Sequence, residues 1–133
     1  VMPQTITKGV KALLAEANAV VTTIPVEEVK ALIGSEDHVI VDLRDFRELK
    51  REGKIPGAFS CPRGMLEFWI DPESPYHKDV FNQDKTYIFY CASAWRSALS
   101  AKIAQEMGLS PVAHIEGGFT AWKKAGGEIE IVE

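Results

Sequence analysis

Short apolar runs alternate with helical patterns along most of this chain, and this alternation constrains its fold more than any other feature. Residues 39–41 and 86–90 consist entirely of β-branched and aromatic residues, as in parallel strands that are buried on both faces. Apolar residues at helical spacing separate these runs and follow a further strand pattern at residues 112–115. The chain is therefore expected to be an α/β protein, with a mainly parallel central sheet of about five strands and helices on both faces.

The expected elements fit one domain, because 133 residues are enough to bury a hydrophobic core without disulfides or metals. We expect an N-terminal helical extension at residues 1–22, the domain itself at residues 23–125, and a loosely held C-terminal tail at residues 126–133. Helices are expected at residues 7–19, 26–33, 46–51, 64–70 and 119–124, with a longer one that ends at Gly108, and short strands at residues 23–25 and 58–61.

Charge and cysteine content exclude several classes of protein. The formal net charge of −4 argues against a surface for nucleic acid or anionic membranes. No segment is apolar over the length of a bilayer, and Lys8, Lys11 and Glu16 interrupt the apolar runs that a signal peptide needs. Two cysteines are too few for the disulfide framework of small secreted proteins, so we expect a reducing, cytoplasmic location. The sequence leaves the oligomeric state open.

Cys91 is the strongest candidate for an active-site residue. It directly follows the strand pattern of residues 86–90 and precedes a helical pattern, so its thiol is expected near a helix N-terminus, which favours negative charge. The small residues Ala92, Ser93 and Ala94 leave backbone N–H groups free to bind an anion. Cys91 is therefore predicted to be a catalytic nucleophile, held in a cradle formed by the backbone of residues 92–96, with the Arg96 side chain as a donor to an oxyanion substrate. Trp95 is expected either to wall the mouth of the pocket or to pack on the domain.

Other candidates lie at neighbouring strand ends, where open parallel sheets bind their ligands. Asp42 and Arg44 follow the strand at residues 39–41, and we interpret them as structural residues near the site that brace its loops through hydrogen bonds and an ion pair with Glu48 or a neighbour. Arg63 is a candidate second anion contact, although a surface arginine is the commoner outcome. Cys61 is interpreted as a buried structural thiol rather than a resolving thiol.

The sequence predicts neither a metal site nor a cofactor. The three histidines, His38, His77 and His114, lack the spacing of metal ligands. His114 falls within a strand pattern and is interpreted as an interior polar group whose hydrogen bonds are satisfied.

Four motifs together resemble the rhodanese family of sulfurtransferases, over nearly everything from Thr23 to Lys124. Residues 41–44 are similar to the family's early Asp-X-Arg motif, and residues 53–58 to its Gly-His-Ile-Pro-Gly-Ala motif, with Lys54 where histidine is common. Residues 91–96 resemble its catalytic loop, and residues 117–122 its Gly-Gly-X-X-Ala-Trp motif.

The resemblance implies a double-displacement reaction without a cofactor. Cys91 would take the sulfane sulfur of a donor such as thiosulfate or glutathione persulfide, and pass it from a cysteine persulfide to cyanide in vitro, or to a thiol or a protein acceptor in the cell. The neutral loop residues suit an organic persulfide better than thiosulfate.

Two alternatives remain open at this point. Phosphatases of the Cdc25 type and arsenate reductases also place a cysteine and an arginine around an anion-binding loop, but with five intervening residues, whereas four separate Cys91 from Arg96. The shorter loop leaves a smaller pocket, which favours a sulfur atom over a phosphoryl group. A non-catalytic rhodanese-like binding module is the second alternative, and the cysteine in the loop argues against it.

Overall fold

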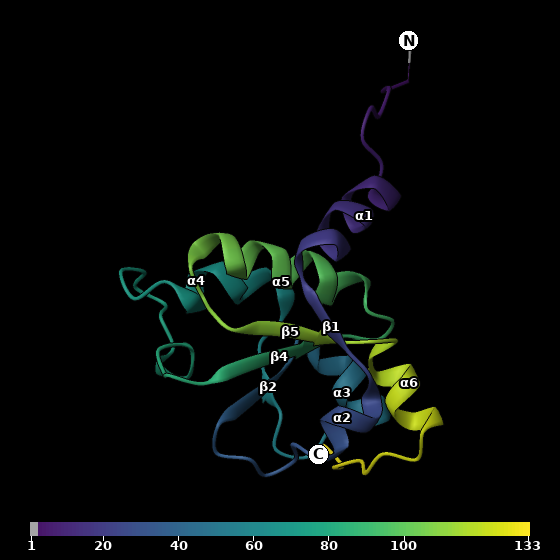
Figure 1. Ribbon diagram of the computed structural model, residues 1–133, viewed down its shortest axis with the longest axis vertical. Coiled ribbons are helices and arrows are strands. Elements are labelled where there is room, and N and C mark those ends of the chain that lie inside the picture. Colours follow the sequence, from purple (N-terminus) through teal and green to yellow (C-terminus); the bar gives the residue numbers. More distant parts are fainter. Residues whose placement is uncertain (1–2) are drawn as a thin grey trace.

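A single parallel sheet forms the centre of the molecule, as the sequence predicts. The structure is a computed structural model that describes residues 3–133. Its strands lie in the order β1-β5-β4-β2-β3, and every neighbouring pair runs parallel (Figure 1). The strands are β1 (Thr22–Ile24), β2 (His38–Asp42), β3 (Phe59–Ser60), β4 (Thr86–Tyr90) and β5 (Val112–Ile115).

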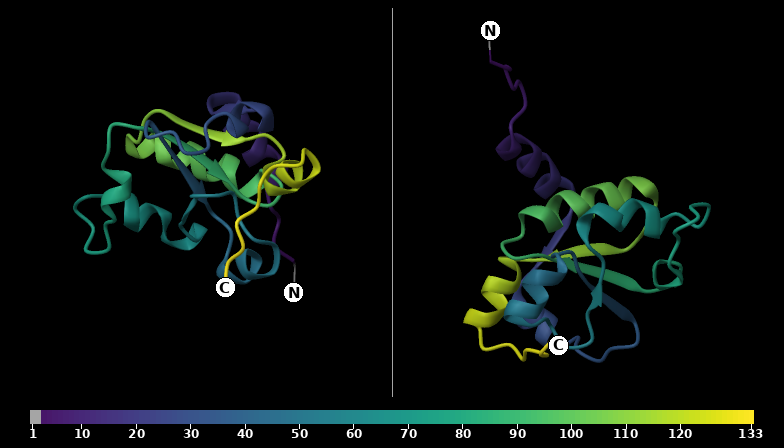
Figure 2. Two further views of the ribbon diagram at one scale, coloured as in Figure 1. Left: turned by 90° about the horizontal axis from the view of Figure 1, so that it is seen from below. Right: turned by 180° about the vertical axis from the view of Figure 1, so that it is seen from behind.

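Helices cover both faces of this sheet. The α-helices are α1 (Val10–Val20), α2 (Val26–Lys30), α3 (Phe46–Glu52), α4 (Leu66–Ile70), α5 (Trp95–Met107) and α6 (Gly118–Lys124), and the short 3-10 helices are η1 (Arg63–Met65) and η2 (Asp79–Phe81). Helices α4 and α5 lie on one face, and α2, α3 and α6 lie on the other (Figures 1 and 2). Within residues 3–133, no helix is both long and apolar enough to cross a membrane.

Two apolar clusters, one on each face of the sheet, make up most of the core. Because alternate strand residues point to opposite faces, Phe89 packs into the cluster that contains Ala101 of α5, while Ile88 packs into the cluster that contains Val29 and Trp122. The uninterrupted apolar run in β4 therefore reflects a strand that is buried on both sides.

Helix α1 lies against α5 rather than directly on the sheet. Leu14 and Ala17 pack on Ala98 of α5, and this small third cluster holds the N-terminal helix in place. The helix begins at Val10, three residues later than the sequence pattern predicts, and residues 3–9 extend away from the body of the molecule (Figure 1).

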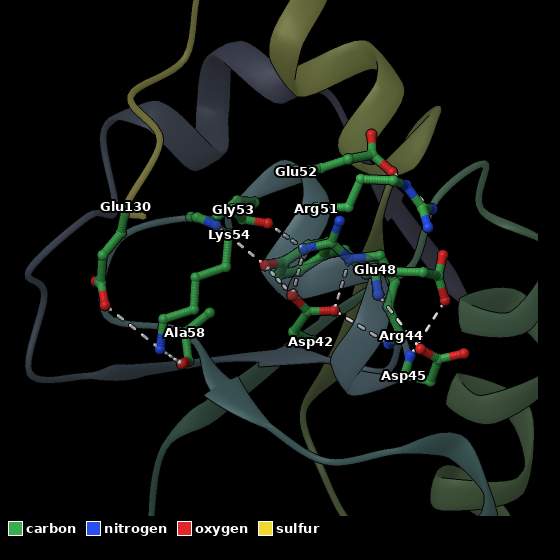
Figure 3. Close-up of polar contacts among 12 residues, drawn as sticks. Asp42, Arg44, Asp45, Glu48, Arg51, Glu52, Gly53, Lys54, Ala58 and Glu130 are labelled. Atoms are coloured by element: carbon green, nitrogen blue, oxygen red, sulfur yellow. Dashed lines mark hydrogen bonds and ion pairs between the residues drawn. The ribbon is translucent and has the colours of Figure 1, made fainter. Parts of the chain in front are cut away.

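The expectation of a loosely held C-terminal tail is wrong. The backbones of Lys54 and Glu130 exchange two hydrogen bonds, of 2.9 and 2.8 Å, and the indole N–H of Trp122 donates to the carbonyl oxygen of Glu128 at 2.7 Å. The Glu130 side chain also accepts from the N–H of Gly57 (Figure 3). These contacts are mainly hydrogen bonds of the backbone, which do not depend on the type of side chain, and this explains why the sequence suggests a solvated acidic end.

Candidate active site

The Cys91 thiol lies where the sequence predicts, between the end of β4 and the first turn of α5. The residue is 1% exposed. Its Sγ atom accepts a hydrogen bond from the backbone N–H of Ser97 at 3.4 Å and lies 3.7 Å from Ser97 Oγ. Both contacts come from the N-terminal turn of α5, whose partial positive charge favours a thiolate over a thiol.

The loop between the thiol and α5 keeps its backbone donors free. Within residues 3–133, none of the N–H groups of residues 92–96 donates a hydrogen bond to a protein atom. Ala94 adopts a left-handed conformation (φ 78°) and directly precedes α5 without a side-chain cap. These donors are available to an anion. Within residues 3–133, the backbone N–H that contacts the Cys91 sulfur belongs to Ser97, just outside the range 92–96.

The Gly117-Gly118 turn holds this loop from the neighbouring strand end. The N–H of Phe119 donates to the carbonyl oxygen of Cys91 at 2.8 Å, and the N–H of Thr120 donates to that of Ala92 at 3.1 Å. A Cβ atom on Gly118 would lie 2.5 Å from the Cys91 carbonyl oxygen, and the residue has φ +61°. Only glycine therefore allows the β5–α6 turn to approach the loop this closely.

A buried ion pair braces the site from the side of β2 (Figure 3). Arg44 donates to both carboxylate oxygens of Asp42, at 3.0 and 2.7 Å, and to the carbonyl oxygen of Gly53 at 2.7 Å. The hydroxyl of Tyr90, the residue before Cys91, donates to Asp42 at 2.6 Å. The guanidinium carbon of Arg44 also lies 4.2 Å from the centre of the Phe119 ring.

Asp42 stabilises the charge of Arg44. Burial alone would lower the pKa of Arg44, but the hydrogen bonds and charge of Asp42 outweigh it and raise that pKa. Asp42 and Arg44 thus connect β2 to Tyr90 and Phe119 on either side of the Cys91 loop. Arg44 pairs with Asp42 rather than with Glu48.

Glu48 pairs instead with Arg96, the expected substrate donor. Arg96 Nη1 and Nη2 donate to the two carboxylate oxygens of Glu48 at 2.8 and 3.0 Å. The hydrogen bond from Arg96 lowers the pKa of Glu48, and Glu48 in turn raises the pKa of Arg96. Glu48 is itself fixed at the start of α3 by a capping box with Asp45. The two-nitrogen fork of Arg96 is therefore occupied by protein in this structure.

The remaining candidates are Arg63, Trp95 and Cys61. Arg63 forms an ion pair with Glu67 at 2.8 Å, one turn further along. Trp95 is 53% exposed at the start of α5. Cys61 is buried, its thiol contacts the carbonyl oxygen of Pro62, and burial raises its pKa to about 12, which leaves almost no thiolate at neutral pH. No group of three or more His, Cys, Asp or Glu residues suitable for a metal ion occurs within residues 3–133.

Sequence reasoning did not single out Ser97, although it contacts the Cys91 sulfur. Ser97 Oγ lies 2.9 Å from His114 Nδ1, and His114 Nε2 lies 3.0 Å from Thr23 Oγ1. His114 is an interior polar group with both ring nitrogens partnered, as interpreted from the sequence, and burial lowers its pKa. The available signal for Ser97 was its spacing from Ala101 and Ala104, four and seven residues further along, which lie on the face of α5 that packs against the sheet.

Comparison with known proteins gives relatives of one family. A model of the rhodanese-like domain matches residues 25–125. The chain is 27% identical over 95 residues to a sulfurtransferase from Allochromatium vinosum, which covers 71% of this chain and 80% of that protein. It is also 27% identical over 100 residues to the thiosulfate sulfurtransferase/rhodanese-like domain-containing protein 3 of Mus musculus; the match covers 71% of this chain but only 64% of the mouse protein.

A solved structure resembles nearly the whole chain. It is a protein of unknown function from Rhodopseudomonas palustris, described as a possible tyrosine phosphatase, with 63% identity and a TM-score of 0.95 over 98% of this chain and 100% of that one. The match to the family model takes in strands β2 to β5, the Cys91 loop and α5, and it begins directly after β1. This chain is a member of the rhodanese family.

Proposed function

We propose that the protein is a sulfurtransferase in which Cys91 carries the transferred sulfur as a persulfide. The observation that carries this proposal is the position of Cys91 Sγ at the N-terminus of α5, beside five backbone N–H groups that have no protein partner within residues 3–133. Such a site stabilises negative charge on sulfur. Both the thiolate and the persulfide carry that charge, so the same donors serve every stage of the reaction.

The proposed reaction has two displacement steps. The Cys91 thiolate attacks the outer sulfur of thiosulfate or of an organic persulfide, forming a new S–S bond. The donor's own S–S bond breaks, and sulfite or a thiolate leaves with the electron pair. An acceptor nucleophile, such as cyanide or a thiol, then attacks the outer sulfur of the Cys91 persulfide and releases the Cys91 thiolate. Electrons balance without an external oxidant or reductant.

The loop and its rim favour an organic persulfide as donor. Residues 92–95 carry no charge, and the one cation that follows, Arg96, is bound by both carboxylate oxygens of Glu48. Little positive side-chain charge is left to hold the sulfonate end of thiosulfate. The exposed Trp95 offers an apolar contact to an organic donor such as glutathione persulfide.

Both cysteines are free thiols, in keeping with a reducing, cytoplasmic compartment.

A phosphatase activity is the competing proposal, because the similar protein from Rhodopseudomonas palustris is described as a possible tyrosine phosphatase. Phosphatase chemistry needs a cation that is free to bind the phosphoryl oxygens. Here Arg96 would first have to leave Glu48, at the expense of two charge-assisted hydrogen bonds. With only four residues between Cys91 and Arg96, the loop also suits a sulfur atom better than a tetrahedral phosphoryl group.

Intact-mass measurement after incubation with glutathione persulfide or thiosulfate tests the proposal. We expect a gain of one sulfur atom that is lost on adding cyanide and absent in Cys91→Ala. The matched control is Cys61→Ala, which should gain sulfur like the unmodified protein. Hydrolysis of an aryl phosphate without any gain of sulfur would assign a phosphatase instead. Absence of both activities would favour a non-catalytic module.

A further inference from the structure

A continuous chain of hydrogen-bonding side chains runs from the active-site sulfur to the edge of the sheet. From Cys91 Sγ, the successive contacts are 3.7 Å to Ser97 Oγ, 2.9 Å to His114 Nδ1, and 3.0 Å from His114 Nε2 to Thr23 Oγ1. The first three residues are buried, whereas Thr23 is exposed on β1, the edge strand (Figure 1). The chain therefore links the sulfur atom of a buried residue to a threonine at the surface of the molecule.

We propose that Cys91, Ser97, His114 and Thr23 form a proton relay, in which every hydrogen bond reverses when the Cys91 thiol becomes a thiolate. This inference deepens the proposed function, because it concerns the same thiol, but it requires only that Cys91 ionises. Ser97 is the relay member that contacts the sulfur, and His114 is a positioning residue that acts through Ser97.

In the thiol state, the hydrogen bonds point away from the sulfur. The Cys91 S–H donates to Ser97 Oγ, so the Ser97 hydroxyl donates to His114 Nδ1. A neutral imidazole that accepts at Nδ1 carries its proton at Nε2 and donates it to Thr23 Oγ1. The Thr23 hydroxyl proton is then free to face solvent.

Ionisation of the thiol reverses this order in four linked transfers. The thiol proton moves to Ser97 Oγ, the former Ser97 proton moves to His114 Nδ1, the Nε2 proton moves to Thr23 Oγ1, and the former Thr23 proton leaves to water. One proton is lost in total. Afterwards Thr23 donates to Nε2, Nδ1–H donates to Ser97, and the Ser97 hydroxyl donates to the thiolate.

The surroundings of His114 suit this relay because its imidazole stays neutral in both states. Its two side-chain partners, Ser97 of α5 and Thr23 of β1, are uncharged, and its register neighbour on β4 is Phe89. Burial lowers the pKa of His114 and so opposes a stable imidazolium. Charged groups on the side of Cys91 include Arg96 of α5, with which Glu48 of α3 is paired, and the Asp42–Arg44 pair behind Tyr90.

The relay gives the thiolate a second hydrogen-bond donor without creating a buried imidazolium. The backbone N–H of Ser97 already faces the sulfur, and reversal adds the Ser97 hydroxyl. A hydrogen bond to a charged group contributes about 1.5–3 kcal/mol, which corresponds to roughly one to two pH units in a titration.

Nitrogen-15 NMR of histidine-labelled protein tests the relay directly, without any sulfur donor. We expect the His114 proton to move from Nε2 to Nδ1 over the same pH range in which ultraviolet absorbance reports formation of the Cys91 thiolate. In Cys91→Ala, His114 should show no such change, and in Cys61→Ala the change should remain. A single His114 tautomer throughout the thiol titration, or an imidazolium that forms with the thiolate, would overturn the proposal.

Variants of two buried serines on α5 separate the relay from general packing. Ser97→Ala should uncouple His114 from the thiol and move the thiol titration to higher pH by about one unit. Ser100→Ala is the matched control, because the Ser100 hydroxyl donates to the backbone of Arg96 rather than to the relay. Equal effects of the two variants would refute the relay. Sulfur transfer is measured separately by mass, so a protein that shows the tautomer change but gains no sulfur would refute the proposed function alone.

Discussion

At the residue scale, Ala94 is the strained position of the active-site loop. It is the one non-glycine residue with a positive φ (78°) within residues 3–133. The left-handed conformation costs a residue with a Cβ atom about 1–2 kcal/mol. This conformation turns the chain directly into α5, and so brings the first turn of the helix onto the Cys91 sulfur.

Ala94→Gly should therefore stabilise the protein. Glycine relieves the strain but loses more backbone freedom on folding, so we expect a net gain of about 0.5–1 kcal/mol in the free energy of unfolding. Urea denaturation measures this gain. Ala92→Gly is the matched control, since Ala92 has a negative φ in the same loop, and it should give no gain. A loss of stability in Ala94→Gly would show that the strain argument is wrong.

At the element scale, the close contact between the β5–α6 turn and the Cys91 loop holds the site together. The two backbone hydrogen bonds from Phe119 and Thr120 join segments that follow adjacent strands, and Gly118 makes their approach possible. The shape of the loop thus depends on Gly118, which lies 27 positions after Cys91 in the chain.

Gly118→Ala should separate the turn from the loop. The added Cβ atom would lie 2.5 Å from the Cys91 carbonyl oxygen, and the alanine would have to keep φ +61°. We therefore expect a loss of about 2–4 kcal/mol in unfolding free energy and a strong loss of sulfur transfer. Chemical denaturation and persulfide formation by mass measure the two effects. Gly57→Ala serves as control, because Gly57 has φ +78° but open space around it, and it should lose only about 1–2 kcal/mol. Equal losses in the two variants would contradict the clash argument.

The elements themselves could be predicted from the sequence because their signals are local. The apolar runs that form β2 and β4 identify strands by residue type alone, and the place of Cys91 between a strand and a helix follows from its neighbours. The partners of Arg96 and Ser97 could not be predicted in this way. Glu48 and His114 lie 48 and 17 positions away, and their contacts depend on the final packing of α3 and β5 against α5.

At the scale of the whole molecule, ion pairs join helices and segments that are distant in sequence. Glu48 of α3 binds Arg96 of α5, Glu52 of α3 binds Lys123 of α6, and the docked tail contributes Glu130. The hydrogen bond from Arg96 lowers the pKa of Glu48, and the hydrogen bond from Lys123 lowers the pKa of Glu52. The pKa of Glu130 is lowered chiefly by the hydrogen bond from the backbone N–H of Gly57. These pairs connect the two faces of the sheet and the C-terminal segment, so the stability of the fold as a whole should depend on their ionisation.

The pH dependence of Glu48→Gln tests this coupling. Arg96 lowers the pKa of Glu48 in the folded protein. Below the ordinary value of 4.5 the unfolded chain therefore binds more protons than the folded protein does, and the free energy of unfolding decreases as the pH decreases. At pH 7 the variant should unfold about 1 kcal/mol more easily than the unmodified protein. That difference should be fully present above pH 4.5 and should disappear as the pH falls through the lowered pKa. Urea denaturation at a series of pH values measures it.

Glu73→Gln, which removes an exposed carboxylate without an ion pair in residues 3–133, should instead follow the unmodified protein at every pH. A difference for Glu48→Gln that persists unchanged at pH 3 would mean that Arg96 gains nothing from the charge of Glu48.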